Sequence, residues 1–319
     1  MITKKKIVVI AGGNGNAITI QALKEYKDDF DISAIVGVAD SGGSSGILRG
    51  EFNTLPPGDI MRAVLAMSGA YDYETLKSIF YKKRFVGLEK LDKHNLGNLF
   101  LVLGAQYSGD YVKAICALEQ SVEAIGKVYP STLNNTHLTA ELENGDIVRT
   151  EGEIDRPSYD KDIKIKKVWL EGQPKIYSEA AKTIEEADYI IFGPGSLYCS
   201  IIAAILPEGF SNAFSNTKAK FVYLAGNHYE LNGETGPTNL GDCLWSLNNY
   251  IGRKIDLVIF NVFKATPKQN QFYKENKWGL MKSDLERLSD MEVKIADFEN
   301  VKGGLDYKKL SEVLKTNLI

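Results

Sequence analysis

Three glycine-rich turns are the part of this sequence best suited to chemistry, because each follows an apolar run typical of a β-strand. The runs cover residues 7–11, 35–39 and 189–192, and a helical pattern follows each turn. A helix start presents free backbone N–H groups, and glycine lets an anion approach them closely. The candidate ligand-binding residues of the turns are Gly12, Gly13, Asn14, Gly15, Asn16, Gly42, Gly43, Ser44, Ser45, Gly193, Pro194, Gly195 and Ser196. Three such turns predict a site for a ligand that carries several phosphates.

Charged side chains near the turns extend this prediction. Asp40 ends the second apolar run, where a carboxylate can hold a ribose hydroxyl or a Mg²⁺ ion, or can organise the loop as an Asx turn. Asp59 follows a Pro-Pro-Gly sequence and suits a helix N-cap. Arg49 and Arg62 can each pair with phosphate through two hydrogen bonds, or lie on the surface as ordinary arginines. If the protein is an enzyme, Asp40 and Asp59 are its candidate catalytic residues, and Asp40 is the candidate metal ligand.

A serine and a histidine allow a different chemistry. The segment 42–46 matches the G-x-S-x-G pattern that presents a nucleophilic serine in α/β-hydrolases. His94 lies in a polar cluster with Asn98 at a helix start, where it can act as a general base, contact phosphate or pack as a cap residue. Hydrolysis by Ser44 is therefore a remote alternative, and contacts of hydroxyl and amide groups with phosphate are the preferred role.

Composition and spacing exclude several classes of function. The net charge of −3 argues against general nucleic-acid binding, which needs a basic surface. The three cysteines are widely spaced and form no zinc-binding pattern, which fits a reducing, cytoplasmic compartment. No apolar stretch approaches the roughly 20 residues of a membrane span. The first turn matches neither the dinucleotide fingerprint nor the Walker A pattern, so its phosphate site is of another type.

The elements that position these residues alternate between strand and helix patterns over most of the chain. Such alternation predicts an α/β fold with a Rossmann-like, doubly wound and mostly parallel sheet, whose ligands lie beyond the carboxyl ends of the strands. Between about residues 127 and 172 the pattern changes to short alternating runs, with Asn144-Gly145 as a hairpin turn. We expect one Rossmann-like domain over residues 1–319 with a small antiparallel β insertion at about 127–172. The long polar loop 226–242 is a candidate lid.

Several motifs of this chain occur together in a known family. In chain order they are Gly12-Gly13-x-Gly15, Asp40-x-Gly42-Gly43-Ser44-Ser45-Gly46-x-Leu48-Arg49, Leu55-Pro56-Pro57-Gly58-Asp59, His94-x-Leu96-Gly97-Asn98, Tyr129-Pro130-Ser131-Thr132 and Gly193-Pro194-Gly195-Ser196-Leu197-Tyr198-x-Ser200. Over nearly the whole chain they resemble the CofD/YvcK-like family. One branch, 2-phospho-L-lactate transferase, moves a phospholactyl group from a guanosine diphosphate-linked donor to a flavin-like acceptor. The other, the bacterial gluconeogenesis factor, binds UDP-sugars and supports cell shape and growth on gluconeogenic carbon, and this chain resembles it more closely.

The resemblance implies roles for particular residues. The turns at 12–16 and 193–196 would hold the diphosphate, while Asp40 and Asp59 would be the acidic residues of the pocket. The residues expected beside the nucleotide and its sugar are Asn227 and Tyr273. Ser41 stands where the family commonly has a second aspartate, which weakens metal chemistry based on two adjacent carboxylates.

The resemblance also implies the partners of this protein. The expected ligand is a nucleotide diphosphate of the UDP-sugar or GDP type, and its binding requires no cofactor. Mg²⁺ is the expected cofactor if the protein transfers a phosphoryl group. Catalysis of that reaction depends mainly on positioning the reactants and on neutralising the phosphate charges, which Mg²⁺ would do. The sequence itself gives no oligomeric state, and a homodimer is one alternative because members of α/β families often pair.

Overall fold

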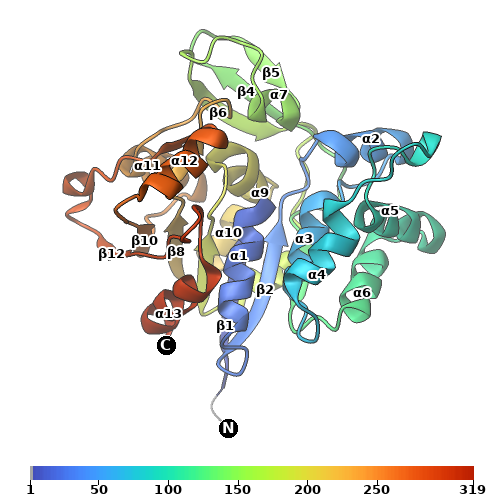
Figure 1. The fold of residues 1–319 in the computed structure, drawn as a ribbon, viewed down its shortest axis with the longest axis horizontal. Coiled ribbons are helices and arrows are strands. Elements are labelled where there is room, and N and C mark those ends of the chain that lie inside the picture. Colours follow the sequence, from blue (N-terminus) through green and yellow to red (C-terminus); the bar gives the residue numbers. More distant parts are fainter. Residues whose placement is uncertain (1–2) are drawn as a thin grey trace.

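The computed structural model describes residues 3–319, and its main sheet in that range has seven strands, all parallel (Figure 1). In chain order the strands are β1 (Lys5–Ile10), β2 (Phe30–Val36), β3 (Lys127–Pro130), β7 (Tyr189–Phe192), β8 (Lys220–Ala225), β10 (Leu257–Asn261) and β12 (Glu292–Ala296). They lie side by side in the order β12-β10-β8-β7-β1-β2-β3. This is the order of a Rossmann fold with one more strand at the end. The predicted α/β, Rossmann-like fold is confirmed.

Helices cover both faces of the main sheet. The α-helices are α1 (Gly13–Lys24), α2 (Gly43–Phe52), α3 (Gly58–Ala66), α4 (Tyr73–Lys77), α5 (Leu96–Ser108), α6 (Tyr111–Ser121), α7 (Glu151–Asp155), α8 (Ser178–Glu185), α9 (Ala203–Ile205), α10 (Phe210–Asn216), α11 (Leu240–Ile251), α12 (Pro267–Glu275) and α13 (Tyr307–Leu318). Short π- and 3₁₀-helices are η1 (Ser78–Lys82), η2 (Glu89–Leu91), η3 (Leu197–Ile202) and η4 (Leu285–Leu288). None of the helices in residues 3–319 is both long and apolar enough to cross a lipid bilayer.

The inner strands contain continuous apolar runs because both of their faces are buried, whereas the edge strand β12 is largely exposed. Ile7 and Val9 of β1 join a core with α1, α3, α5, α6 and α13, while Val8 and Ile10 join a second core with α8, α10 and α11. Successive side chains of a strand point to opposite faces, so one apolar run supplies both cores. The result is a three-layer sandwich that holds the carboxyl ends of the strands at one edge.

A small antiparallel sheet lies beyond that edge, at the top of Figure 1. Its strands are β4 (Leu138–Leu142), β5 (Ile147–Arg149) and β6 (Ile165–Leu170), in the order β5-β4-β6. The predicted hairpin at Asn144-Gly145 joins β4 to β5, and Gly145 has φ +91°. The insertion is narrower than expected, because β3 pairs with β2 in the main sheet, and α7 interrupts the strands.

Loop 226–242 carries a short strand of its own. Strand β9 (His228–Glu230) pairs with β11 (Trp278–Leu280) in an antiparallel ribbon. The His228 ring stacks on the Trp278 ring with 3.8 Å between the ring centroids. These contacts fix the first part of the loop, and the remainder reaches the third glycine turn.

Candidate ligand-binding site

The three glycine turns lie side by side, because they follow β7, β1 and β2, which are neighbours in the main sheet. The strand order reverses between β1 and β7, and open α/β sheets bind ligands in the crevice beyond such a point. A methyl group on Gly15 would collide with the carbonyl group of Pro194, and one on Gly195 would lie 3.8 Å from the carbonyl oxygen of Gly12. The structure therefore brings the predicted turn residues together at one edge of the sheet.

The first turn leaves the start of α1 open. Gly12 is the N-cap residue, and no side chain among residues 3–319 caps this helix. Gly13 has φ +65°, a backbone conformation that favours glycine, and Asn14 is exposed. The side-chain amide of Asn16 turns inward and donates to the carbonyl oxygen of Ala11 (3.2 Å). The N–H groups of the first helical turn are thus available to an anion.

The second turn opens α2 in the same way. Gly42 is the N-cap residue and donates its N–H to Oδ1 of Asp40 (2.8 Å), and the described chain offers this helix no side-chain cap either. Gly43 has φ +47°, and a methyl group there would meet no atom of the described residues within 4 Å. Ser45 lies against the start of α3, where its Oγ would be 2.6 Å from a methyl group on Gly58. Helices α1 and α2 therefore both start at this edge with glycine N-caps.

Asp59 and Arg62 lie on α3 between the two open helix starts. Asp59 lies against Gly12, where an added methyl group would collide with the carboxylate. Arg62 donates from Nη1 to Oδ1 of Asp59 (3.0 Å) and from Nη2 to the hydroxyl of Tyr81 (2.9 Å). The side chains of Arg62 and Asp59 are 20% and 19% exposed, so this ion pair borders the crevice.

Carboxyl groups from the β insertion complete this edge, and sequence reasoning missed them. The Glu151 carboxylate accepts the N–H of Ser41 (3.1 Å), and the N–H of Gly152 donates to the Ser41 hydroxyl (2.8 Å). One ligand atom each of Glu151, Asp155 and Cys199 lies within 4.8 Å of the others. Residues 151–155 match no motif and lie in a stretch with a strand pattern, so only the folded chain brings them here.

Crowding and burial raise the pKa values of these carboxyl groups. Burial, and then the charge of Asp40, raises the pKa of Glu151 to about 8. Burial, and then the charge of Asp59, raises the pKa of Asp40, while burial raises the pKa of Asp155. A divalent cation would favour the charged forms, and carboxylate oxygens are the ligands that Mg²⁺ prefers. Glu151 and Asp155 therefore offer carboxylates that suit Mg²⁺, whereas the Cys199 thiol beside them does not.

The third turn differs from the first two, because a carboxylate already accepts N–H groups at the start of the helix that follows it. The backbone after Ser196 forms η3, which continues into α9. The Glu234 carboxylate accepts the N–H groups of Tyr198 (3.1 Å) and Cys199 (2.9 Å). Burial raises the pKa of Glu234. Diphosphate binding by residues 193–196 stays a prediction, and two N–H groups of this helix start are already used.

Arg49 faces the protein interior rather than the crevice. It is 3% exposed, donates from Nε to Oδ1 of Asn135 (2.8 Å) and from Nη1 to the carbonyl of Ala39 (3.2 Å). Its Nη2 donates to the carbonyl of Thr136. Arg49 thus ties the second turn to the segment after β3, and this structural role corrects the expectation of a phosphate contact.

Ser44, His94 and Asn98 meet beneath the second turn. The Ser44 Oγ lies 2.8 Å from Nδ1 of His94 and accepts the side-chain amide of Asn98 at 3.0 Å. Ser44 is 2% exposed, and in the described residues no carboxylate hydrogen-bonds to the His94 ring. A serine nucleophile needs an accessible hydroxyl and a base oriented by a third group. The structure therefore gives the hydrolase alternative no support, although it joins the serine to a histidine.

Asn227 and Tyr273 lie together at the ends of β8 and α12, in a buried cluster around Glu299. The Asn227 amide donates to the Tyr273 hydroxyl (2.9 Å) and to Glu299 (2.7 Å), and the Tyr273 hydroxyl donates to Glu299 (2.7 Å). The amide of Asn261 (2.9 Å) and the N–H of Gly304 (2.7 Å) complete four donors to one carboxylate. These contacts place the two residues near each other, and their contact with a nucleotide stays a prediction.

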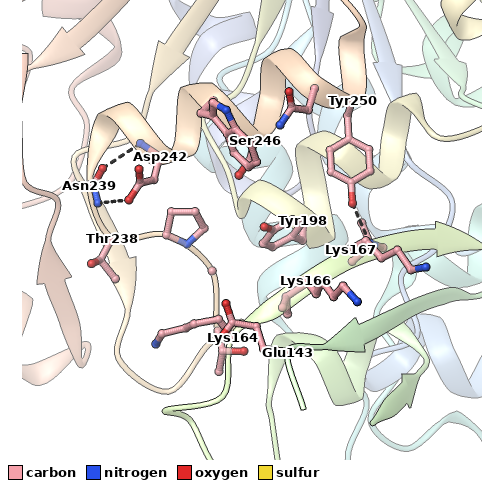
Figure 2. Close-up of a pocket in the computed structure, with 17 residues that line it drawn as sticks. Glu143, Lys164, Lys166, Lys167, Tyr198, Thr238, Asn239, Asp242, Ser246 and Tyr250 are labelled. Atoms are coloured by element: carbon pink, nitrogen blue, oxygen red, sulfur yellow. Dashed lines mark hydrogen bonds between the residues drawn. The ribbon is translucent and has the colours of Figure 1, made fainter. Parts of the chain in front are cut away.

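A separate cleft of about 830 Å³ lies between β6 and α11 (Figure 2). Tyr250 accepts the N–H of Val168 (2.7 Å) across it, and Asn239 and Asp242 bond to each other at its rim (2.7 Å). The described residues that line this cleft include none of the predicted site residues. It meets the glycine-turn edge through Tyr198, which follows the third turn.

Comparisons with known proteins agree with the geometry. The model of the family described as 2-phospho-L-lactate transferase CofD matches residues 7–299. A putative gluconeogenesis factor of Clostridium acetobutylicum is 33% identical over 319 residues, which cover 99% of this chain and 69% of that protein. The gluconeogenesis factor of Bacillus subtilis is 34% identical over 92% of this chain and 90% of its own length.

A solved structure extends this similarity to three dimensions. The crystal structure of a UPF0052 family member from Bacillus halodurans has a TM-score of 0.89 and 30% identity to this chain. The match covers 99% of this chain and 100% of the other. The similarity therefore includes the main sheet, the small sheet and the three turns.

Proposed function

Since the chain belongs to the CofD family, in which its relatives include gluconeogenesis factors, we propose that it binds a nucleotide diphosphate of the UDP-sugar type at the edge where its glycine turns meet. The resemblance that the motifs predicted is confirmed at the level of the family. The proposed role is regulatory: a cytoplasmic binding protein that supports central carbon metabolism and cell shape, as the names of its relatives indicate for gluconeogenesis.

The observation that carries this proposal is the pair of open helix starts at α1 and α2. Both helices have glycine N-caps without a side-chain cap in the described chain. Helix α1 starts beside the reversal of strand order, and α2 starts one strand further along the sheet. Two sets of N–H groups on adjacent helices favour a ligand with two linked anionic groups. Arg62 borders the same crevice, where its charge is paired with Asp59.

Phosphoryl transfer is the second candidate, and the acidic residues at this edge favour it. Asp40, Asp59, Glu151 and Asp155 would hold Mg²⁺, which would neutralise the phosphates and favour their reaction. This is the activity named in the family description, 2-phospho-L-lactate transferase. Formation of a phosphate ester on a deazaflavin acceptor tests it, and absence of product with the donor, acceptor and Mg²⁺ all present would exclude it.

Thermal unfolding with added nucleotides tests the first proposal. We expect UDP-N-acetylglucosamine or UDP-glucose to stabilise the full chain by about 2.7 kcal/mol at 100 times its Kd. GDP and GTP test whether the site prefers uracil or guanine, and uridine, which has no phosphate, is the negative control. Parallel series with and without Mg²⁺ test whether binding depends on the cation. No shift with any of the four nucleotides would contradict the proposal.

A further inference from the structure

Loop 82–93, between η1 and α5, has an exposed apolar tip at the outer edge of the molecule (Figure 1). Val86, Leu88 and Leu91 are 85%, 53% and 39% exposed. Tips of loops usually carry glycine, proline and small polar residues, because these suit both turns and contact with water. Exposed apolar side chains that lie together indicate a surface that contacts another protein or a membrane.

Hydrogen bonds within the loop fix its backbone. The N–H of Phe85 donates to the carbonyl of His94 (2.9 Å), and the N–H of Lys93 donates to the carbonyl of Phe85 (3.1 Å), so the two ends of the loop pair with each other. At the tip, the N–H of Leu91 donates to the carbonyl of Leu88 (3.1 Å). The apolar side chains are therefore exposed by a closed loop with a defined shape.

Basic side chains flank the apolar tip along the chain. Residues 82–93 contain five basic and two acidic residues, although the net charge of the whole chain is −3. Among residues 3–319, only Lys82 of the five forms an ion pair, with Glu74 (2.7 Å). One of the two acidic side chains, Asp92, accepts the N–H of Leu88 within the loop (3.0 Å). The five basic residues, all exposed, are Lys82, Lys83, Arg84, Lys90 and Lys93.

We propose that loop 82–93 docks the protein on the surface of a membrane that contains anionic lipids. Val86, Leu88 and Leu91 would enter the boundary between the head groups and the acyl chains. The basic side chains would contact the lipid phosphates, since their long stems let the charge stay at the head groups while the apolar residues lie deeper. Docking of this kind lies at the membrane surface and needs no helix that spans the bilayer.

The composition of the loop favours a lipid surface over nucleic acid or another protein. Proteins that bind single-stranded nucleic acid stack the bases on aromatic side chains, whereas the three residues of this tip are aliphatic. Protein interfaces contain little lysine, whereas four of the five basic residues here are lysine. An anionic membrane is complementary both to the positive charge and to the apolar tip.

The loop is joined to the element that carries the second glycine turn. His94, whose carbonyl closes the loop, has its Nδ1 2.8 Å from the Oγ of Ser44 on α2. Docking of the loop would therefore place the membrane next to the support of this turn. The proposal does not depend on which ligand the glycine turns bind.

Flotation of the full chain with lipid vesicles tests the proposal. We expect binding to phosphatidylcholine vesicles that contain about 30% phosphatidylglycerol, and none to vesicles of phosphatidylcholine alone. Salt at about 0.5 M should weaken the binding, because it screens the attraction between exposed charges and the lipid surface. No nucleotide is added, so a failure here leaves the proposed nucleotide binding untouched.

Two pairs of variants separate the apolar and the electrostatic contributions. Val86→Asp should weaken vesicle binding by about tenfold or more. Val301→Asp is its matched control, because Val301 is also an exposed valine in a loop (70%), and this change should leave binding intact.

Lys83→Glu combined with Lys90→Glu should have an effect similar to that of Val86→Asp. Lys268→Glu combined with Lys274→Glu changes the net charge equally on exposed residues of α12 and should have a much smaller effect. All the substituted residues are exposed, and circular dichroism checks that each variant folds.

Three outcomes would overturn the proposal. The first is a wild-type chain that does not float with the anionic vesicles. The second is vesicle binding that Val86→Asp weakens no more than Val301→Asp does. The third is wild-type binding to poly(U) RNA that Lys83→Glu with Lys90→Glu abolishes while vesicle binding persists, which would assign the loop to nucleic acid instead.

Discussion

The first and third glycine turns lie next to each other, but the helices that follow them differ in whether a side chain accepts their first N–H groups. The first leads into α1, whose N-cap Gly12 has no side-chain cap in the described residues. The third leads into η3, where the Glu234 carboxylate accepts the N–H groups of Tyr198 and Cys199. The turns follow neighbouring strands, β1 and β7, so their surroundings in the sheet are alike.

This difference shows that a glycine-rich turn does not by itself make an anion site. In both turns glycine gives access to the backbone, but a distant side chain decides whether the N–H groups are free. Glu234 provides an internal anion to one helix start. In residues 3–319 no side chain accepts an N–H of the first turn of α1 or α2, although Asp40 accepts the N–H of the N-cap residue Gly42. The ligand site is therefore expected to centre on the first and second turns, with the third as its wall.

The largest effect on stability is expected from Gly15→Ala, which disrupts the contact between the first and third turns. The new methyl group would collide with the backbone carbonyl of Pro194, which cannot rotate away as a side chain does. We expect the free energy of unfolding to fall by about 2–3 kcal/mol. Urea denaturation measures this. Gly50→Ala is the control, because Gly50 lies in α2 with open space around it in the described structure. This change should raise the free energy of unfolding by about 0.5–1 kcal/mol, since alanine favours a helix more than glycine does.

The next effect is expected from Glu234→Ala, which removes the internal anion. Two N–H groups at the start of η3 lose their acceptor, so we expect the free energy of unfolding to fall by about 1–3 kcal/mol. Pyrophosphate should then stabilise the variant more than it stabilises the wild type, because the third turn now resembles the first. Thermal unfolding with and without pyrophosphate measures both effects.

Glu230→Ala is the control for this experiment, because Glu230 lies on β9 in the same loop and is exposed. It should change neither stability nor the response to pyrophosphate. Equal responses of wild type and Glu234→Ala to pyrophosphate would refute the view that Glu234 takes the place of an anion.

A smaller effect is expected from pH, through Glu151 at the open part of the site. Its folded pKa, about 8, lies above its ordinary value, so the folded protein holds this proton more tightly than the unfolded chain does. Stability should therefore fall as pH rises from about 5 to 8, by about 1–2 kcal/mol after allowance for solvent screening. Glu151→Gln should flatten this slope, and Glu153→Gln, an exposed residue of the same helix, should not.

Added Mg²⁺ provides a second test of the role of the Glu151 carboxyl group. If Mg²⁺ binds among the carboxylates of Asp40, Glu151 and Asp155, it should reduce the loss of stability toward pH 8 in the wild type. Urea denaturation at pH 5 and pH 8, with and without Mg²⁺, measures this. An identical slope in wild type and Glu151→Gln would show that the proton is held elsewhere.

The fold and half of the site could be predicted from local sequence. Apolar runs followed by glycine turns and helical patterns dictate a parallel sheet, and a parallel sheet places all such turns at one edge. That reasoning needs no contact between distant residues. It located Asp40, Asp59 and Arg62, which the structure places around the first two turns.

The remainder depends on contacts between distant residues that carry no local signal. Glu151 comes from the β insertion and reaches Ser41 across 110 residues, and Glu234 reaches Tyr198 across 36. Arg49 follows a glycine turn, as a phosphate ligand would, yet its guanidinium turns inward to Thr136. Only the packing of the folded chain decides whether such groups face a ligand or the protein.

The smallest effect on stability is expected from Gly42→Ser. This change tests whether a side-chain cap at the start of α2 is enough to keep its N–H groups from binding the ligand. Gly42 has φ −85° and ψ 149°, which suit serine at an N-cap, and the nearest atom to an added Cβ is Oδ1 of Asp40 at 3.4 Å. Stability should change by only a few tenths of a kcal/mol. The serine hydroxyl would accept an N–H of the first turn of α2, so affinity for UDP-N-acetylglucosamine should fall several-fold in calorimetric titration. Unchanged affinity with a capped helix would mean that the ligand uses α1 alone, and the two open helix starts would no longer be equivalent.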